Sequence, residues 1–164
     1  MTRFIKSVAA ISAILATAVA PVATAQTAPE LVGTWALVSS VAEQGGAKID
    51  TLGPNPKGTL MFGNDGHYAL AFVRSDLPKV ASNNRSSQTP DESRAIAQGV
   101  ITHFGTYTVV EANKVMVFHV ERSSFPNWDG AEQRRAFTVK KDELIYTSPG
   151  STGTATQVVM RRVQ

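Results

Sequence analysis

Histidine is the side chain best suited to transfer protons near neutral pH and to hold zinc, and this 164-residue chain has three: His67, His103 and His119. No two of them have the HxH or HExxH spacing of known zinc motifs. His119 and Glu121 are two residues apart, so in a strand they point to the same face and place an imidazole beside a carboxylate. This pair is a candidate polar ligand site, and its alternative role is that of rim or surface residues. We expect no metal site.

Other motifs for catalysis are absent from the sequence. No serine lies in a GxSxG elbow, the chain has no cysteine, and the glycine-containing stretch at 53–59 lacks the spacing of a phosphate-binding loop. We therefore assign no catalytic residue and expect no cofactor.

Aromatic and charged residues in strand-like runs are candidates for lining an interior. In the run 67–74, Tyr68, Phe72 and Arg74 share one face, with Arg74 near a mouth. A ligand carboxylate or phenolate would pair well with an arginine in such a place. The candidate ligand-binding residues are Tyr68, Phe72, Arg74, Tyr107, His119, Glu121, Trp128, Arg134 and Tyr146, with Phe118 and Phe137 supplying further apolar area.

Residues 123–130, SSFPNWDG, form the most unusual predicted loop, because Phe125 and Trp128 are costly to expose. One interpretation is a lid that places Trp128 against a ligand. The other is that both aromatic side chains fold back onto the protein as a small satellite core, and we favour this second interpretation.

All the candidate ligand-binding residues except Trp128 lie on eight short runs of alternating polarity separated by turn residues, which is the pattern of antiparallel strands. Asn64, Asp65 and Gly66 form a hairpin signal in which the glycine supplies a positive φ. Short hairpins join neighbouring strands, and eight such strands bury their edges best by closing into an up-and-down barrel. An open sandwich is the alternative architecture. The runs are 33–43, 58–63, 67–74, 104–111, 114–121, 132–140, 143–147 and 154–162.

The segment 75–103 interrupts this pattern. Thr89 can cap a helix, with Pro90 at its first position and acidic residues in its first turn. A modest apolar stripe follows and includes Val100 and Ile101. We predict one helix of about ten residues that packs over a mouth of the barrel, as a lid, or against its outside, as a buttress.

The first 25 residues have the features of a cleaved secretory signal peptide. Two basic residues precede an apolar run at 8–20, and Ala23-Thr24-Ala25 fits the A-x-A pattern of signal peptidase. A membrane anchor is the alternative, but a spanning helix needs about 20 apolar residues and this run is shorter. We expect a signal peptide at 1–25, a linker at 26–30, one domain at 31–164, and a periplasmic or secreted protein.

Cleavage after Ala25 would leave a nearly neutral chain, with 16 − 2 = 14 Lys and Arg against 13 Asp and Glu. Such a balance does not favour nucleic acid as a partner, because nucleic acid requires a clustered basic face. We expect no membrane-spanning segment after cleavage, and the oligomeric state is open. The remaining 164 − 25 = 139 residues have no cysteine for disulfides, so their stability must come from one hydrophobic core.

Gly33-Thr34-Trp35 at the head of the first predicted strand resembles the Gly-Xaa-Trp signature of lipocalin and calycin barrels. In those barrels the tryptophan closes one end, and an arginine of the last strand packs across its indole. The resemblance implies that Trp35 is a structural plug. Arg161 and Arg162 point to opposite faces of the last strand, so one of them can reach Trp35 for a cation–π contact.

The chain after the signal is similar to the bacterial lipocalin-like domain family in five collinear segments. This resemblance implies an eight-stranded calycin-type barrel with an inner cavity, and it implies no established reaction, although some relatives occur beside biosynthetic enzymes. The segments are LVGTWALVS, GPNPKGTLMF, DLPKVASNNR, FGTYTV and SSFPNWDGAEQRR.

Three functions fit these observations. The first is binding of a small hydrophobic or amphipathic molecule in the barrel. The second is a cofactor-independent isomerase or cyclase acting on a polyketide- or terpenoid-like substrate, with His119 or Glu121 moving one proton. The third is a structural or interaction protein with a filled barrel. A cavity separates the first two from the third.

Overall fold

The computed structural model describes residues 28–150 and 152–164. The predicted signal peptide and the first residues of the predicted linker lie outside these described residues. The elements are β1 (Gly33–Gln44), β2 (Ala47–Asp50), β3 (Lys57–Phe62), β4 (His67–Val73), α1 (Pro90–Gly99), β5 (Val100–Val110), η1 (Glu111–Asn113), β6 (Val115–Ser123), η2 (Pro126–Trp128), β7 (Glu132–Lys140), β8 (Glu143–Ser148) and β9 (Thr156–Arg162).

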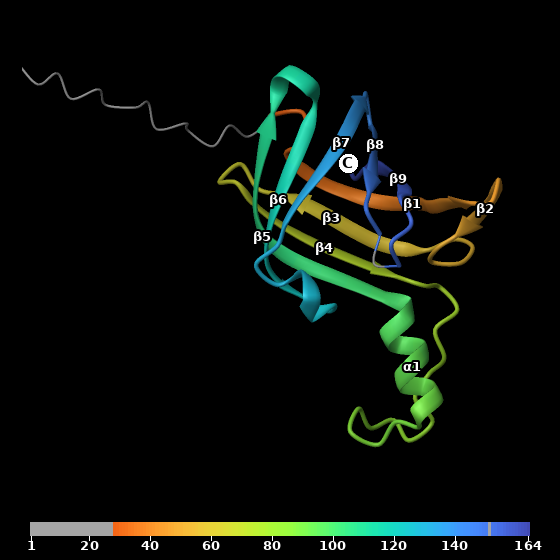
Figure 1. The fold of residues 1–164 in the computed structure, drawn as a ribbon. Helices are drawn as coiled ribbons and strands as arrows, with labels where there is room; N and C mark the ends of the chain where they lie inside the picture. Colours follow the sequence, from red (N-terminus) through yellow and green to blue (C-terminus); the bar gives the residue numbers. More distant parts are fainter. Residues whose placement is uncertain (1–27, 151) are drawn as a thin grey trace, which may run out of the picture.

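The strands form one antiparallel sheet that closes on itself (Figure 1). From β3 onward, each strand pairs with the next along the chain until β9. β1 pairs with both β3 and β9, which closes the sheet. The predicted eight-stranded barrel is therefore confirmed, and the sandwich alternative does not apply. The described strands also include β2, which was not predicted because its four residues, AKID, form a very short run. All four are exposed, and β2 turns back on β1 through Gly45 and Gly46, both at positive φ.

The helix begins as predicted. The Thr89 side chain accepts a hydrogen bond from the backbone N–H of Glu92, and the Glu92 carboxylate accepts one from the backbone N–H of Thr89. α1 ends at Gly99, so Val100 and Ile101 belong to β5 and not to a helical stripe. Both are β-branched, and they pair with Val73 and Phe72 of β4, which extends β5 toward the N-terminus beyond its predicted start at 104. Figure 1 shows α1 projecting from one end of the barrel.

A tryptophan closes the opposite end. The Trp35 side chain is fully buried, and its indole N–H donates to the Leu31 carbonyl at 2.8 Å. The guanidinium of Arg162 lies 4.1 Å from the centre of the indole and donates to the carbonyls of Val32 and Glu30. Gly33 has φ 122°, and a Cβ there would lie 3.1 Å from Arg162 Nη1. The Gly-Xaa-Trp motif therefore combines a backbone that favours glycine with room for the arginine.

Most of the interior is filled by side chains. The core continues from Trp35 through Leu60, Phe62, Tyr107, Met116, Phe118, Phe137, Leu144 and Met160, all less than 5% exposed. The Tyr107 hydroxyl donates to the Gly63 carbonyl at 2.9 Å, and its ring packs edge-on against Phe62. The end of the barrel near Trp35 is therefore packed, and the space for a ligand lies at the α1 end.

Candidate functional site

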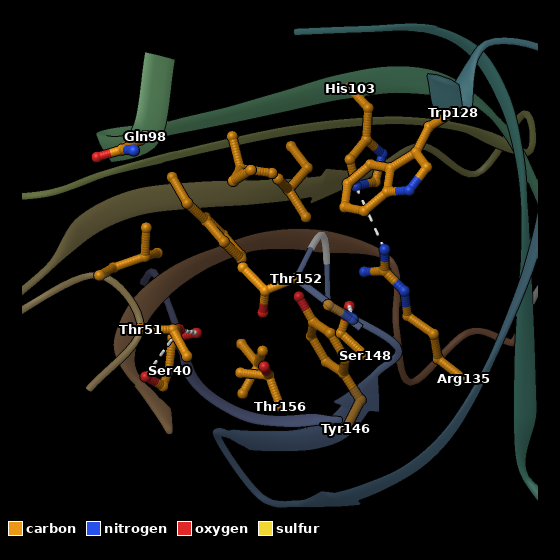
Figure 2. A pocket seen from close by; sticks show the side chains of 16 residues that line it. Ser40, Thr51, Gln98, His103, Trp128, Arg135, Tyr146, Ser148, Thr152 and Thr156 are labelled. Carbon is orange, nitrogen blue, oxygen red and sulfur yellow. Dashed lines mark hydrogen bonds between the residues drawn. The ribbon is translucent and has the colours of Figure 1, made fainter. Parts of the chain in front are cut away.

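A pocket of about 120 Å³ occupies the α1 end of the barrel interior (Figure 2). A space of this size holds a group about as large as a benzene ring, because engineered apolar cavities of about 150 Å³ bind benzene. The pocket is lined by Ser40, Thr51, Leu52, Leu70, Phe72, Gln98, Ile101, His103, Trp128, Arg135, Tyr146, Ser148, Gly150, Thr152, Thr156 and Val158.

The lining is divided between apolar and polar groups. Leu52, Leu70, Phe72, Ile101 and Val158 supply the apolar surface. A pair of hydroxyls, Ser40 and Thr51, lies 2.7 Å apart on the β1 side, and further hydroxyls come from β8, the β8–β9 loop and β9. Such a lining suits an amphipathic molecule better than a purely apolar one.

The charged member of the lining is Arg135 on β7, which is 2% exposed. Its Nη2 donates to Gln133 Oε1 and lies 3.4 Å from Nε2 of His103. The other ring nitrogen of His103, Nδ1, is 2.9 Å from the Tyr68 hydroxyl. The Arg135 guanidinium also lies over the rings of Phe118, at 4.5 Å, and Tyr146, at 5.4 Å. We call Tyr68, His103, Gln133, Arg135 and Tyr146 the Arg135 cluster.

Burial controls the charge of each titratable group in the Arg135 cluster. Desolvation and the nearby Arg135 lower the pKa of His103 to about 3, so its imidazole is neutral. Desolvation raises the pKa of Tyr146 to about 12 and raises that of Tyr68 as well, so both phenols keep their protons. Desolvation also lowers the pKa of Arg135, but an arginine remains protonated at neutral pH. The cluster therefore carries one positive charge.

Three buried polar atoms of the Arg135 cluster have no hydrogen-bond partner in the described part of the chain. They are Arg135 Nε, Gln133 Nε2 and the Tyr146 hydroxyl. Buried polar groups are nearly always hydrogen-bonded, and leaving one unpaired costs about 1–3 kcal/mol. Of the residues that carry these atoms, Arg135 and Tyr146 line the pocket, so they are candidates for contacts with a bound molecule.

Trp128 forms the edge of the pocket. It lies on η2, within the predicted loop SSFPNWDG, and its ring packs edge-on against Phe125 and His103. The Asp129 carboxylate holds the loop by accepting hydrogen bonds from the Ser123 backbone N–H and from Arg122. The two aromatics do fold back onto the protein, and Trp128 also lines the pocket. The packing of both rings fits the satellite-core interpretation, and whether Trp128 contacts a ligand stays a prediction.

Several of the ligand-binding residues predicted from the sequence lie inside the barrel. Phe72, Trp128 and Tyr146 line the pocket. Tyr68 is buried behind His103, and Tyr107 lies in the packed half. Alternation along β4 places Tyr68 and Phe72 on its inner face, as the sequence predicted.

Four other candidates lie away from the pocket lining. His119 and Glu121 are exposed on the outer face of β6, where His119 is 3.9 Å from Glu132. Arg134 is exposed on the outer face of β7 and pairs with Glu132 at 3.3 Å. Arg74 follows β4 and forms a two-pronged pair with Asp76. These placements correct the expectation that His119, Arg74 or Arg134 would be the polar group of an interior site.

The interior polar residues that sequence reasoning missed are His103 and Arg135. Both follow from parity along a strand. Phe137 was expected to point into the barrel. Arg135 is two residues away on β7 and therefore points to the same side, whereas Arg134 points to the opposite side. Tyr107 was expected inside as well, and two steps of two residues back along β5 lead to His103. Arg161 is exposed, and Arg162 is the arginine over Trp35.

The described residues contain no cluster of three or more His, Asp or Glu side chains able to hold a metal ion. A family model for the lipocalin-like domain matches residues 32–161. This chain belongs to the lipocalin-like domain family. The match includes β1 to β8, all of β9 except Arg162, and every residue of the Arg135 cluster in this lipocalin-like barrel. No curated protein matches the chain.

Solved structures similar to this lipocalin-like domain are β-barrels of low sequence identity. A redesigned β-barrel is 12% identical, with a TM-score of 0.44, and the match covers 82% of this chain and 93% of that one. Two variants of the fluorescent protein UnaG are 14% and 15% identical, each with a TM-score of 0.37. These matches cover 82% of this chain and 97% and 96% of theirs. Within residues 28–150 and 152–164, no helix is long and apolar enough to cross a bilayer.

Proposed function

We propose that this lipocalin-like domain binds a small amphipathic molecule in the pocket at the α1 end of its barrel. The observation that carries the proposal is the pocket itself, which is lined by Arg135 and Tyr146 together with an apolar wall; each of these two side chains has a buried polar atom without a partner. A filled barrel with a purely structural role gives no reason to bury these donors beside open space. The rest of the interior is packed, so the ligand enters from the α1 end.

We also propose that the domain acts in the periplasm or outside the cell. The basic residues, apolar run and Ala23-Thr24-Ala25 at the N-terminus support this location. The test is to express the full chain and determine the N-terminal sequence of the protein in the periplasmic fraction. A mature N-terminus at Gln26 supports export, and an uncleaved chain retained in the cytoplasm contradicts it.

Native mass spectrometry of the gently purified mature protein tests ligand binding. We expect a reproducible adduct of small mass, which denaturing extraction releases for identification. The matched control is Val158→Phe, which adds a ring to the pocket wall and should remove the adduct while the barrel still folds. An adduct that is equally abundant on the control protein would place the ligand elsewhere and contradict the proposal.

A second candidate function is a cofactor-independent isomerase or cyclase of polyketide- or terpenoid-like substrates. One observation favours it: His103, Arg135 and Tyr146 place polar groups beside the apolar wall of the pocket, where together they can hold a substrate in a reactive conformation. His119 and Glu121, by contrast, lie outside the barrel. Conversion of the extracted ligand by the native protein, lost in His103→Gln with binding retained, supports this function, and no change in the ligand on prolonged incubation contradicts it.

A further inference from the structure

The charge on Arg135 has no protein counter-charge. None of the ion pairs within the described residues includes Arg135. By contrast, Arg74, Arg122 and Arg134 each pair with a carboxylate at 2.8–3.3 Å. The hydrogen-bond partners of Arg135 are an amide and an imidazole, both neutral. Buried charges in proteins are paired, because removing a lone ion from water costs several kcal/mol. This site therefore lacks one negative charge.

Arg135 and Tyr146 are the two members of the Arg135 cluster that both line the pocket and carry an unpartnered buried polar atom. Nη2 of Arg135 is engaged by Gln133 and His103, whereas Nε has no partner. The Tyr146 hydroxyl is also unpartnered, and it keeps its proton, so it can donate. Figure 2 shows the Tyr146 hydroxyl and the Arg135 guanidinium directed toward the same part of the pocket. Two donors that converge in this way match an oxygen anion.

The charge and size of the site select among anions. One guanidinium supplies a single positive charge, and the other polar groups of the Arg135 cluster are neutral, so a monoanion balances the site and a phosphate dianion does not. Leu70, Phe72 and Val158 then offer an apolar wall to the remainder of the ligand. The pocket of about 120 Å³ has room for only part of a larger molecule, and the rest must extend toward the α1 mouth.

We infer that the ligand is an amphipathic monocarboxylic acid whose carboxylate accepts hydrogen bonds from Arg135 and Tyr146. Its apolar part lies against Leu70, Phe72 and Val158. This inference rests on the proposed ligand-binding function and adds the chemical class of the ligand. Arg135 is the residue that separates an acid from its neutral analogue.

Paired probes test the charge requirement. Hexanoate, octanoate and decanoate are titrated by calorimetry into the mature protein at neutral pH, and each is compared with the primary alcohol of the same length. We expect at least one acid to bind about tenfold or more tightly than its alcohol, as a charge-assisted hydrogen bond to a buried arginine requires. Chain length is the same within each pair, so the difference reports only the head group.

Two neighbouring arginines provide a matched pair of variants. Arg135→Met should remove the preference for the acid, so that the acid and the alcohol of the same length bind with similar affinity. Arg134→Met, which removes the adjacent but outward-facing guanidinium, should retain the preference in full. Arg135→Gln replaces the methionine variant if that variant does not fold. Tyr146→Phe should also weaken acid binding, by a smaller factor than either Arg135 variant.

The outcomes distinguish the two proposals. Equal affinity of the native protein for acids and alcohols overturns the carboxylate inference and leaves ligand binding standing. An acid preference that survives in both Arg135 variants also overturns it, because the anion would then be recognised elsewhere. Binding of no acid and no alcohol overturns the proposed function and this inference with it.

Discussion

The two ends of the barrel each hold an arginine over an aromatic ring, but their guanidinium groups differ in what satisfies them. Arg162 lies 4.1 Å from the Trp35 ring and donates to two backbone carbonyls. Arg135 lies 4.5 Å from the Phe118 ring, is more deeply buried, and keeps a donor without a partner. An arginine over an aromatic ring therefore has its donors satisfied by the fold at one end and keeps an unpaired charge at the other.

The largest expected effect is on the packed end. Trp35→Ala should lower the free energy of unfolding by about 3–5 kcal/mol, because it removes a fully buried indole and the platform beneath Arg162. Urea unfolding followed by circular dichroism measures this change. The control is Trp128→Ala at the pocket edge, where the ring is only half-buried and the loss should be much smaller. Equal losses would mean that the two ends do not differ in packing.

The two arginines should respond to methionine with opposite signs. Arg162→Met should destabilise the protein by about 1–3 kcal/mol, since two carbonyls lose charged donors and the cation–π contact is lost. Arg135→Met should stabilise the ligand-free protein by about 1–3 kcal/mol, since the cost of an unpaired buried charge exceeds the cost of the hydrogen bond that Gln133 loses. Thermal and urea unfolding measure both changes. A destabilised Arg135→Met would show that its charge is compensated in the ligand-free fold.

The α1 end of the barrel should also make the free energy of unfolding depend on pH, through His103. The folded protein keeps His103 neutral down to a pKa of about 3, whereas in the unfolded chain it takes a proton near pH 6.5. Between these values the unfolded state binds more protons, so stability falls as the pH falls, with a slope of up to about 1.4 kcal/mol per pH unit. Urea unfolding between pH 7 and pH 5 measures the slope.

A second histidine provides the control for this pH dependence. His103→Gln should reduce the slope between pH 7 and pH 5, whereas His119→Gln, on the exposed outer face of β6, should leave it nearly unchanged. His103 faces Tyr68 and Arg135, and neither of these groups titrates in this range. An unchanged slope in His103→Gln would assign the acid sensitivity to other groups.

The smallest expected effect concerns α1. Thr89→Ala removes the N-cap and one half of the capping box, which should destabilise the helix by about 1 kcal/mol. Because Gly99 is the one buried residue of α1, the loss should be local. Hydrogen exchange should show faster exchange of the α1 amides and unchanged exchange of the β1 and β9 amides near Trp35. Faster exchange throughout the barrel would show that α1 supports the whole fold.

The fold could be predicted from the sequence because its signals are local. Alternation along the runs, the turn at Asn64-Asp65-Gly66 and the Thr89 cap each depend on neighbouring residues, and the structure confirms strands and helix at these places. β2 escaped prediction because its alternating run, AKID, is only four residues long and follows two glycines. The start of β5 was placed too late because Val100 and Ile101 suit either a helical stripe or a strand, and only their pairing with β4 decides.

The candidate site could be predicted only in part, because its residues meet through the barrel and not along the chain. Tyr68, Phe72, Tyr107 and Tyr146 were correctly predicted to lie inside, because large apolar side chains alternate with polar ones along their strands. A buried charge gives no such signal, so Arg135 was passed over for its neighbour Arg134. The alternation along β7 places Arg135 on the same inner face as Phe137. This indication competes with the ordinary cost of burying a guanidinium, which favours an exposed arginine.

Pairing of β1 with β9 has a consequence for the time course of folding. Trp35 and Arg162 are register partners, so the seam of the barrel joins residues from nearly opposite ends of the domain. Closing so long a loop is entropically costly, and topologies rich in distant contacts fold in milliseconds to seconds. The seam cannot form before the last strand has left the ribosome. Until then β1 and β8 each present an open edge, and a chain shortened before β9 is expected to aggregate.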